Sequence, residues 1–210
     1  MPVSLLASIT LTNADEPGNA ASRAERSYRL RTSPPRPRWR SSAPRVVNRP
    51  DAQLLLDDHF YYSGEIPRVT SFEKGRVDHL SRRSPDAPWE PDPLLMDERM
   101  LVVHVRDLGL IVFSACSHAG IVNVCTHTRN LFPDIPIYCV MGGLHLGGVM
   151  ERIIPDTVEG LRPFRINHII TGHCTGWRAL HALADAFGDA VSQSAVGTKY
   201  TFDAGHHLSL

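Results

Sequence analysis

The 210-residue sequence lacks long apolar runs and has few cysteines, and both absences narrow its class. No window approaches 18 uninterrupted apolar residues, and the short apolar stretch at the start has no basic residues before it. Neither a membrane span nor a secretory signal is therefore indicated. The cysteines have no paired short spacing, which argues against a disulfide framework or a structural zinc knot. They are Cys116, Cys125, Cys139 and Cys174. We expect reduced thiols in a cytoplasmic protein.

The sequence also lacks a net charge, but its charges are unevenly distributed. Residues 1–50 hold nine arginines and three acidic residues, so the remaining residues carry a net charge of −6. The stretch TSPPRPRWRSSAPR is rich in Pro, Ser and Arg and has no apolar period, which predicts a poorly ordered extension over 1–50 and a folded domain over 51–210. An Arg-rich leader also fits a mitochondrial transit peptide or a nucleic-acid-binding arm. The acidic domain argues against nucleic acid as a partner.

From residue 51 onward, short apolar runs alternate with segments of helical periodicity. The runs predict strands at 52–56, 100–105, 108–115, 135–141 and 166–171. The periodic segments predict helices at 120–132, 154–164 and 175–188, the last with Trp177, Leu180, Ala184 and Phe187 on one face. This alternation predicts an α/β fold with a largely buried sheet.

Three histidines directly follow predicted strands. His118 and His173 come after the third and fifth apolar runs, and His145 follows Gly142 and Gly143 after the fourth. Ligands of α/β proteins bind outside the strand ends, and histidine is the commonest protein ligand of metal ions. Three imidazoles at equivalent positions therefore suggest a zinc or similar site with one open position. Hydrogen-bonded structural histidines are the alternative.

Four motifs, in order, resemble one family. SGEIPRVTSFEKG, LVVHVRDLGLIVFSACSHAGIVN, MGGLHL and TGHCTGWRALHAL are similar to the C-terminal half of the metallo-β-lactamase superfamily, in the branch of dihydropterin-(ribofuranosyl)aminobenzene phosphate synthase-like proteins. The resemblance covers about residues 51–202. It implies an αββα sandwich, a divalent metal such as zinc with His118 and His173 as ligands, and a contact of His145 with metal or substrate. It also implies a hydrolase or transferase that acts on a small molecule, with a phosphorylated substrate among the candidates.

The sequence departs from this family in its first half. Members carry an HxHxDH signature that supplies most metal ligands, whereas no H-x-H pair occurs in the 210 residues. We therefore expect a truncated enzyme of doubtful activity, and a non-catalytic binding protein that kept half of the fold is the alternative.

Two further features suggest substrate binding. Glu65 and Arg68 follow a predicted strand, where Arg68 could hold an anion with two parallel hydrogen bonds. Thr175 is a candidate N-cap of the last helix, whose first backbone N–H groups could hold a phosphate. A surface salt bridge and an ordinary helix start are the alternative interpretations.

Half of a two-sheet sandwich would leave an apolar sheet face without its partner. We therefore expect the 210-residue chain to form oligomers or to aggregate. Sedimentation velocity tests this expectation, and a stable monomer that unfolds cooperatively would contradict it.

Overall fold

The computed structural model describes residues 49–96, 98–203 and 206–209. Residues 1–48, which make up nearly all of the expected extension, lie outside the described residues. The division of the chain near residue 50 therefore stays a prediction.

A seven-stranded sheet forms the centre of the molecule, with the order β1-β2-β5-β6-β7-β8-β9. Strands β1, β2, β5 and β6 pair antiparallel, and β6, β7, β8 and β9 pair parallel. The strands are β1 (Gln53–Leu55), β2 (Phe60–Tyr62), β5 (Met100–Val105), β6 (Gly109–Ser114), β7 (Ile137–Gly143), β8 (His168–Gly172) and β9 (Val191–Gln193). Two small hairpins are separate from this sheet, β3 (Leu80–Ser81) with β4 (Glu90–Pro91) and β10 (Thr201–Asp203) with β11 (His206–Ser209).

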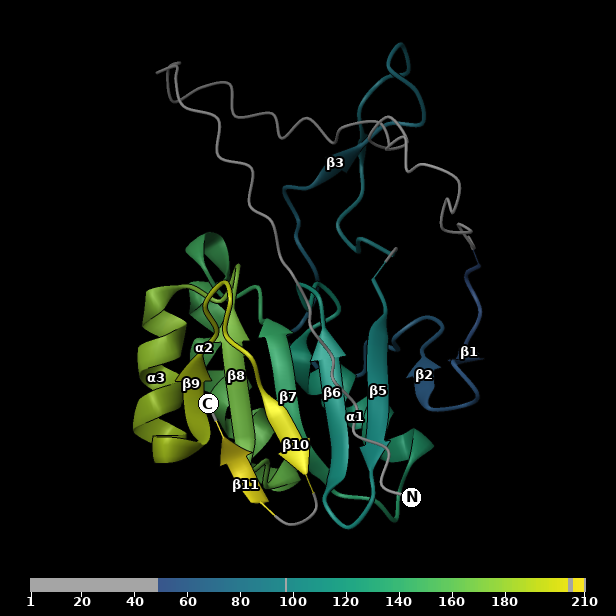
Figure 1. Ribbon diagram of the computed structural model, residues 1–210. Helices are drawn as coiled ribbons and strands as arrows, with labels where there is room; N and C mark the ends of the chain where they lie inside the picture. Colours follow the sequence, from purple (N-terminus) through teal and green to yellow (C-terminus); the bar gives the residue numbers. More distant parts are fainter. Residues whose placement is uncertain (1–48, 97, 204–205, 210) are drawn as a thin grey trace.

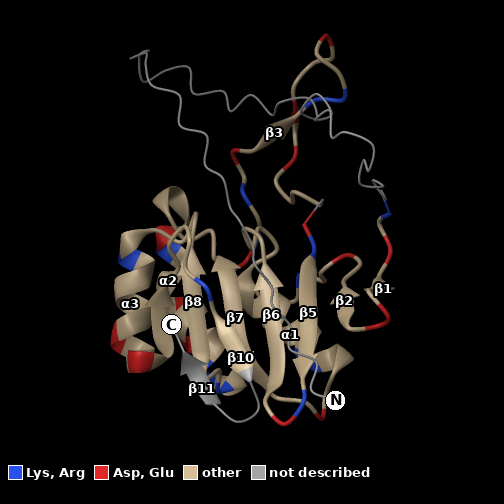
Figure 2. Cartoon of the chain, in the orientation of Figure 1, with Lys and Arg blue, Asp and Glu red and all other residues tan. Residues whose placement is uncertain are grey.

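Three α-helices cover one face of the sheet, and the β10–β11 hairpin lies over the other (Figure 1). The helices are α1 (Ile121–Leu131), α2 (Ile154–Leu161) and α3 (Trp177–Phe187). Short 3₁₀ helices lie at Gly148–Ile153, Arg162–Phe164 and Gly188–Ala190. Because side chains alternate along a strand, Leu110 and Val112 join the core under the helices, while Ile111 joins a smaller cluster on the opposite face. The strands of the sheet are largely uncharged, as burial requires (Figure 2).

The structure confirms the α/β class and contains all eight predicted elements. It adds β2 and β9 to the sheet, and the four strands of the two hairpins, none of them longer than four residues. The predicted face of α3 is wrong, since Trp177 is 68% exposed and the helix buries Ala179 and Leu183 instead. No helix in the described part of the chain is long and apolar enough to cross a membrane.

The parallel arrangement brings the carboxyl ends of β6, β7 and β8 to one edge of the sheet (Figure 1). Gly142, near the end of β7, has a φ of 141° and lies directly against the backbone of β6. A Cβ atom at this position would overlap the carbonyl oxygen of Ser114. The strand end is therefore a place where only glycine allows the backbones to approach so closely.

A carboxylate from a distant segment caps helix α1. Its own N-cap residue, Gly120, provides no side-chain hydrogen bond. Instead, buried Glu73 accepts hydrogen bonds from the backbone N–H groups of Val122 and Asn123, both at 2.9 Å, and from the Thr70 hydroxyl at 3.0 Å. Burial raises the pKa of Glu73, while these hydrogen bonds oppose the rise. Glu73 thus fixes the start of α1, directly after the loop that carries His118.

We predict that Glu73→Ala lowers the free energy of unfolding by about 1–3 kcal/mol, because it leaves buried donors of α1 without an acceptor. Urea denaturation followed by circular dichroism measures this change. Glu159→Ala is the control, since Glu159 forms only an exposed ion pair with Arg162 and its loss should cost less than about 0.5 kcal/mol. Equal losses in the two variants would contradict the capping role.

Candidate functional site

Each of the three strand-end loops contains a non-glycine residue in the left-handed region. Ser117 after β6, His145 after β7 and His173 after β8 have φ values of 58°, 47° and 50°. Such conformations are uncommon for residues with a side chain, and they are maintained only where surrounding contacts hold them. Two of the three residues are predicted metal ligands, and the third precedes His118. The loops therefore turn sharply at the same edge of the sheet.

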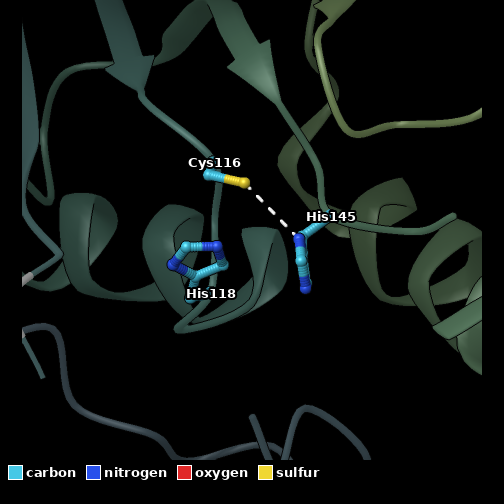
Figure 3. Close-up of side chains that lie close together, drawn as sticks. All are labelled: Cys116, His118 and His145. Carbon is cyan, nitrogen blue, oxygen red and sulfur yellow. Dashed lines mark hydrogen bonds between the residues drawn. The ribbon is translucent and has the colours of Figure 1, made fainter. Parts of the chain in front are cut away.

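Two of the predicted histidines meet next to a cysteine (Figure 3). The rings of His118 and His145 lie 4.5 Å apart and nearly perpendicular to each other. The Sγ atom of Cys116 lies 3.4 Å from Nδ1 of His145. One ligand atom from each of these three half-buried residues lies within 4.8 Å of the others. This distance is compatible with a shared metal ion.

The third predicted histidine belongs to a second group that also contains Cys116. His173 and Cys174 each place a ligand atom within 4.8 Å of Cys116 and of each other. The Sγ atoms of Cys116 and Cys174 are only 2.7 Å apart, and Cys174 Sγ accepts a hydrogen bond from the backbone N–H of His145 at 3.2 Å. Cys116 therefore connects the two groups, and His173 is the most exposed of the five residues.

The two site cysteines share a hydrogen bond that separates their protonation behaviour. Hydrogen bonding from Cys116 lowers the pKa of Cys174 to about 4, with burial opposing it and His145 assisting it. The same hydrogen bond, together with burial, raises the pKa of Cys116. The pair thus favours one thiolate, on Cys174, and one thiol. Cys125 and Cys139 differ, because burial raises the pKa of both, that of Cys139 to about 12.

The donors of this edge suit a zinc-like ion. Two sulfurs and three imidazoles form the nitrogen and sulfur set that zinc prefers among the common divalent metals. In addition, Nε2 of His145 is buried and has no hydrogen-bond partner among the described residues. A buried imidazole nitrogen without a partner is costly unless something binds it. The residues present therefore fit a bound metal ion.

Two hydroxyl groups, those of Ser117 and Thr175, form hydrogen bonds with the backbone at the ends of β7 and β8. Ser117 donates a hydrogen bond to the carbonyl of Gly143 at 2.6 Å. Thr175 donates to the carbonyl of Gly172 at 2.8 Å and accepts from the N–H of Leu144 at 3.1 Å. The predicted N-cap role of Thr175 is wrong, because Gly176 is the N-cap of α3 and no side chain caps that helix. Thr175 instead ties the β7 and β8 loops together, and substrate binding by it stays a prediction.

Arg68 lies at the rim of the site and braces the His118 loop. Its guanidinium donates hydrogen bonds to the carbonyl of His118, at 2.6 Å, and to the carbonyl of Leu94. Burial lowers the pKa of Arg68, and nearby Glu98, Glu73 and Glu65 oppose the shift. Glu65 itself is exposed, whereas Arg68 contacts the loop that carries His118, and substrate binding by either residue stays a prediction.

Sequence reasoning missed the two cysteines and two carboxylates that surround the site. The sequence predicts only that Cys116 and Cys174 are reduced thiols, although each lies within two residues of a predicted ligand in ACSH and GHC. That adjacency was the available signal. Glu73 and Glu98 had no such signal. Glu98 accepts a hydrogen bond from the N–H of Ala119 at 2.5 Å, while its other oxygen is buried and unpartnered among the described residues.

Comparisons with known proteins agree with this geometry. No family model matches the chain. The sequence is 35% identical over 83 residues to 7,8-dihydropterin-6-methyl-4-(β-D-ribofuranosyl)-aminobenzene-5′-phosphate synthase of Methanocaldococcus jannaschii. This alignment covers 40% of this chain and 28% of that protein. An uncharacterized protein of the same archaeon is 28% identical over 129 residues, 61% of this chain and 45% of that protein.

A solved structure described as a metal-dependent hydrolase of the β-lactamase superfamily superposes with a TM-score of 0.62 and 24% identity. The superposition covers 75% of this chain and 58% of the chain of that structure. The metallo-β-lactamase-like fold is therefore confirmed, and the resemblance to the dihydropterin phosphate synthase branch is supported by sequence as well. The chain spans less than two thirds of the length of each of these proteins.

The pKa of Cys174 leads to a prediction for thiol reactivity in metal-free, reduced protein. Because the thiolate is already formed above about pH 4, alkylation of Cys174 by iodoacetamide should change little between pH 5 and 8. An ordinary thiol would gain about tenfold per pH unit over this range. Peptide mass spectrometry measures the rate at each cysteine.

Cys116→Ala tests the cause of this shift. Removal of the hydrogen bond from Cys116 should raise the pKa of Cys174 and restore a steep pH dependence. Cys125 and Cys139 should stay unreactive in the folded protein and serve as internal controls. A steep profile for Cys174 in the parent protein would contradict the prediction.

Proposed function

We propose that this chain supplies the second half of a metallo-β-lactamase-type hydrolase or transferase and holds a divalent ion, with zinc the best match, at the edge formed by β6, β7 and β8. The observation that carries the proposal is the convergence of two cysteines and three histidines there. They are Cys116, His118, His145, His173 and Cys174. The fold of the structural neighbour and its description as metal-dependent support the assignment.

A divalent ion bound there would supply Lewis acidity for cleavage or transfer of an ester, phosphoester or related group. The chain's own residues supply the ligands and their orientation. Hydrogen bonds from Ser117 and Thr175 hold the loops, and Arg68 fixes the backbone at His118. Fixed loops keep the ligands in place before the ion arrives, which favours tight binding.

A small phosphorylated molecule is the substrate class that we propose. Arg68 uses part of its five N–H donors on two carbonyls, which leaves donors for an anion at the rim of the site. Glu65 and Thr175 complete the proposed contacts. The name of the relative in Methanocaldococcus jannaschii describes a product with a 5′-phosphate, which fits this class. Basic and acidic residues are interspersed over the described part of the chain, a mixed distribution that favours a small ligand over nucleic acid (Figure 2).

A metal-binding protein without catalysis is the second candidate. The sequence contains no H-x-H pair, so the ligands that this motif brings to the family are missing from these residues. A reducing compartment such as the cytoplasm suits either candidate, because thiols bind metal only when they are reduced.

The test measures zinc affinity and melting temperature, with and without chelator, for the parent, His118→Ala, His173→Ala and the double variant. If both histidines serve one ion, each single change should weaken zinc binding by about 10-fold or more, and the double change should add little. His181→Ala is the control, because His181 is an exposed residue of α3. Chelator-insensitive melting of the parent with additive losses in the variants would overturn the metal site.

Turnover separates the two candidates. Zinc-loaded protein is incubated with chromogenic phosphomonoesters, phosphodiesters and carboxylate esters. Metal-dependent hydrolysis that is lost in His118→Ala supports the enzyme, whereas tight zinc binding without hydrolysis of any of these substrates supports the binding protein.

A further inference from the structure

Two thiols meet across an intervening strand at the edge of the sheet. Cys116 follows β6 and Cys174 follows β8, and β7 lies between these strands. Their Sγ atoms are nevertheless only 2.7 Å apart. A disulfide bond is about 2.05 Å long, so a movement of about 0.7 Å would bring the two sulfurs to bonding distance. Both residues are half-exposed, in contrast to the fully buried Cys125 and Cys139.

The end of β7 is shaped to let these sulfurs meet. A Cβ atom at Gly143 would lie 2.8 Å from Cys174 Sγ and 3.0 Å from the carbonyl oxygen of Ala115. The missing side chain therefore leaves the space in which the two cysteines approach. Backbone hydrogen bonds hold both loops there, from Gly143 N–H to Ala115 and from Gly147 N–H to the Cys174 carbonyl.

We propose that Cys116 and Cys174 form a reversible intramolecular disulfide on reaction with a small oxidised thiol such as glutathione disulfide. One thiolate of the pair attacks the disulfide, forms a mixed disulfide with one glutathione and releases the other as a thiolate. The second protein thiol loses its proton to solvent and attacks the mixed disulfide, which forms the Cys116–Cys174 bond and releases the second glutathione. Two protein thiols are oxidised and one glutathione disulfide is reduced to two thiols.

The disulfide would switch the site off. Sulfurs joined to each other are no longer thiolates, and thiolates are the form in which cysteine binds metal. Both groups of candidate ligands contain Cys116, so oxidation would remove a donor from each. This consequence rests on the proposed metal site, whereas the formation of the disulfide does not.

The experiment uses the full chain, reduced and freed of metal by a chelator, and then incubated with excess glutathione disulfide. Thiols are counted after unfolding in the presence of an alkylating reagent, and disulfide-linked peptides are identified by mass spectrometry. The sequence has four cysteines, so we expect the count to fall from four to two, with one peptide pair joined through Cys116 and Cys174.

Three variants make the result specific. Cys174→Ser should accumulate a glutathione adduct on Cys116, and Cys125→Ser should form the same disulfide as the parent. Gly143→Ala keeps both thiols but pushes the loops apart, and should slow disulfide formation by about 10-fold or more. Gly147→Ala is its matched control, because Gly147 has a φ of −82° and a Cβ there would lie no closer than 3.5 Å to another atom.

Four free thiols, or separate glutathione adducts without a crosslink, would overturn the proposal, provided that circular dichroism shows folded protein. Parent-like crosslinking in Gly143→Ala would overturn its geometric basis. Zinc titration before and after oxidation separates the two proposals. A crosslink in a protein that never binds zinc refutes the metal site and retains the disulfide. Zinc binding without any crosslink does the reverse.

Discussion

The close approach of three backbones at the carboxyl end of β7 is the constraint on which the rest of the structure depends. Gly142 lies against the carbonyl of Ser114, and Gly143 lies between the loops that follow β6 and β8. A side chain at either position would separate these loops. Because both positions are glycine, the loops after three strands meet at one point, and their histidines and cysteines lie close enough to share a metal ion.

The loops reach this point in conformations that are unfavourable in isolation. Ser117, His145 and His173 adopt left-handed backbone angles, each a cost of order 1–3 kcal/mol that local preference does not offset. Hydrogen bonds from Ser117 and Thr175 and the contact of Arg68 with the His118 carbonyl hold these turns. These contacts thus maintain the strained backbone conformations that orient the candidate metal ligands.

The pattern of apolar runs was enough to predict β6, β7 and β8, because buried strands of five to seven residues leave a strong signal. It also placed His118, His145 and His173 at strand ends. It could not show that Cys116 and Cys174 meet, because their contact crosses β7 and depends on the left-handed turns. The prediction of the buried face of α3 was wrong for another reason. Alanine and leucine occupy several of its sides, so the period alone allows more than one buried face.

The cap of α1 has a consequence for the order in which the chain folds. Glu73 lies about 50 residues before the N–H groups that it accepts from, and Asn123 in turn accepts from the N–H groups of Val69 and Thr70. A helix that begins with a glycine and has no local cap nucleates poorly by itself. Its first turn becomes stable only when a long loop has closed, and loop closure of this kind slows folding. We therefore expect the helix start, and with it the His118 loop, to form in the late steps of folding.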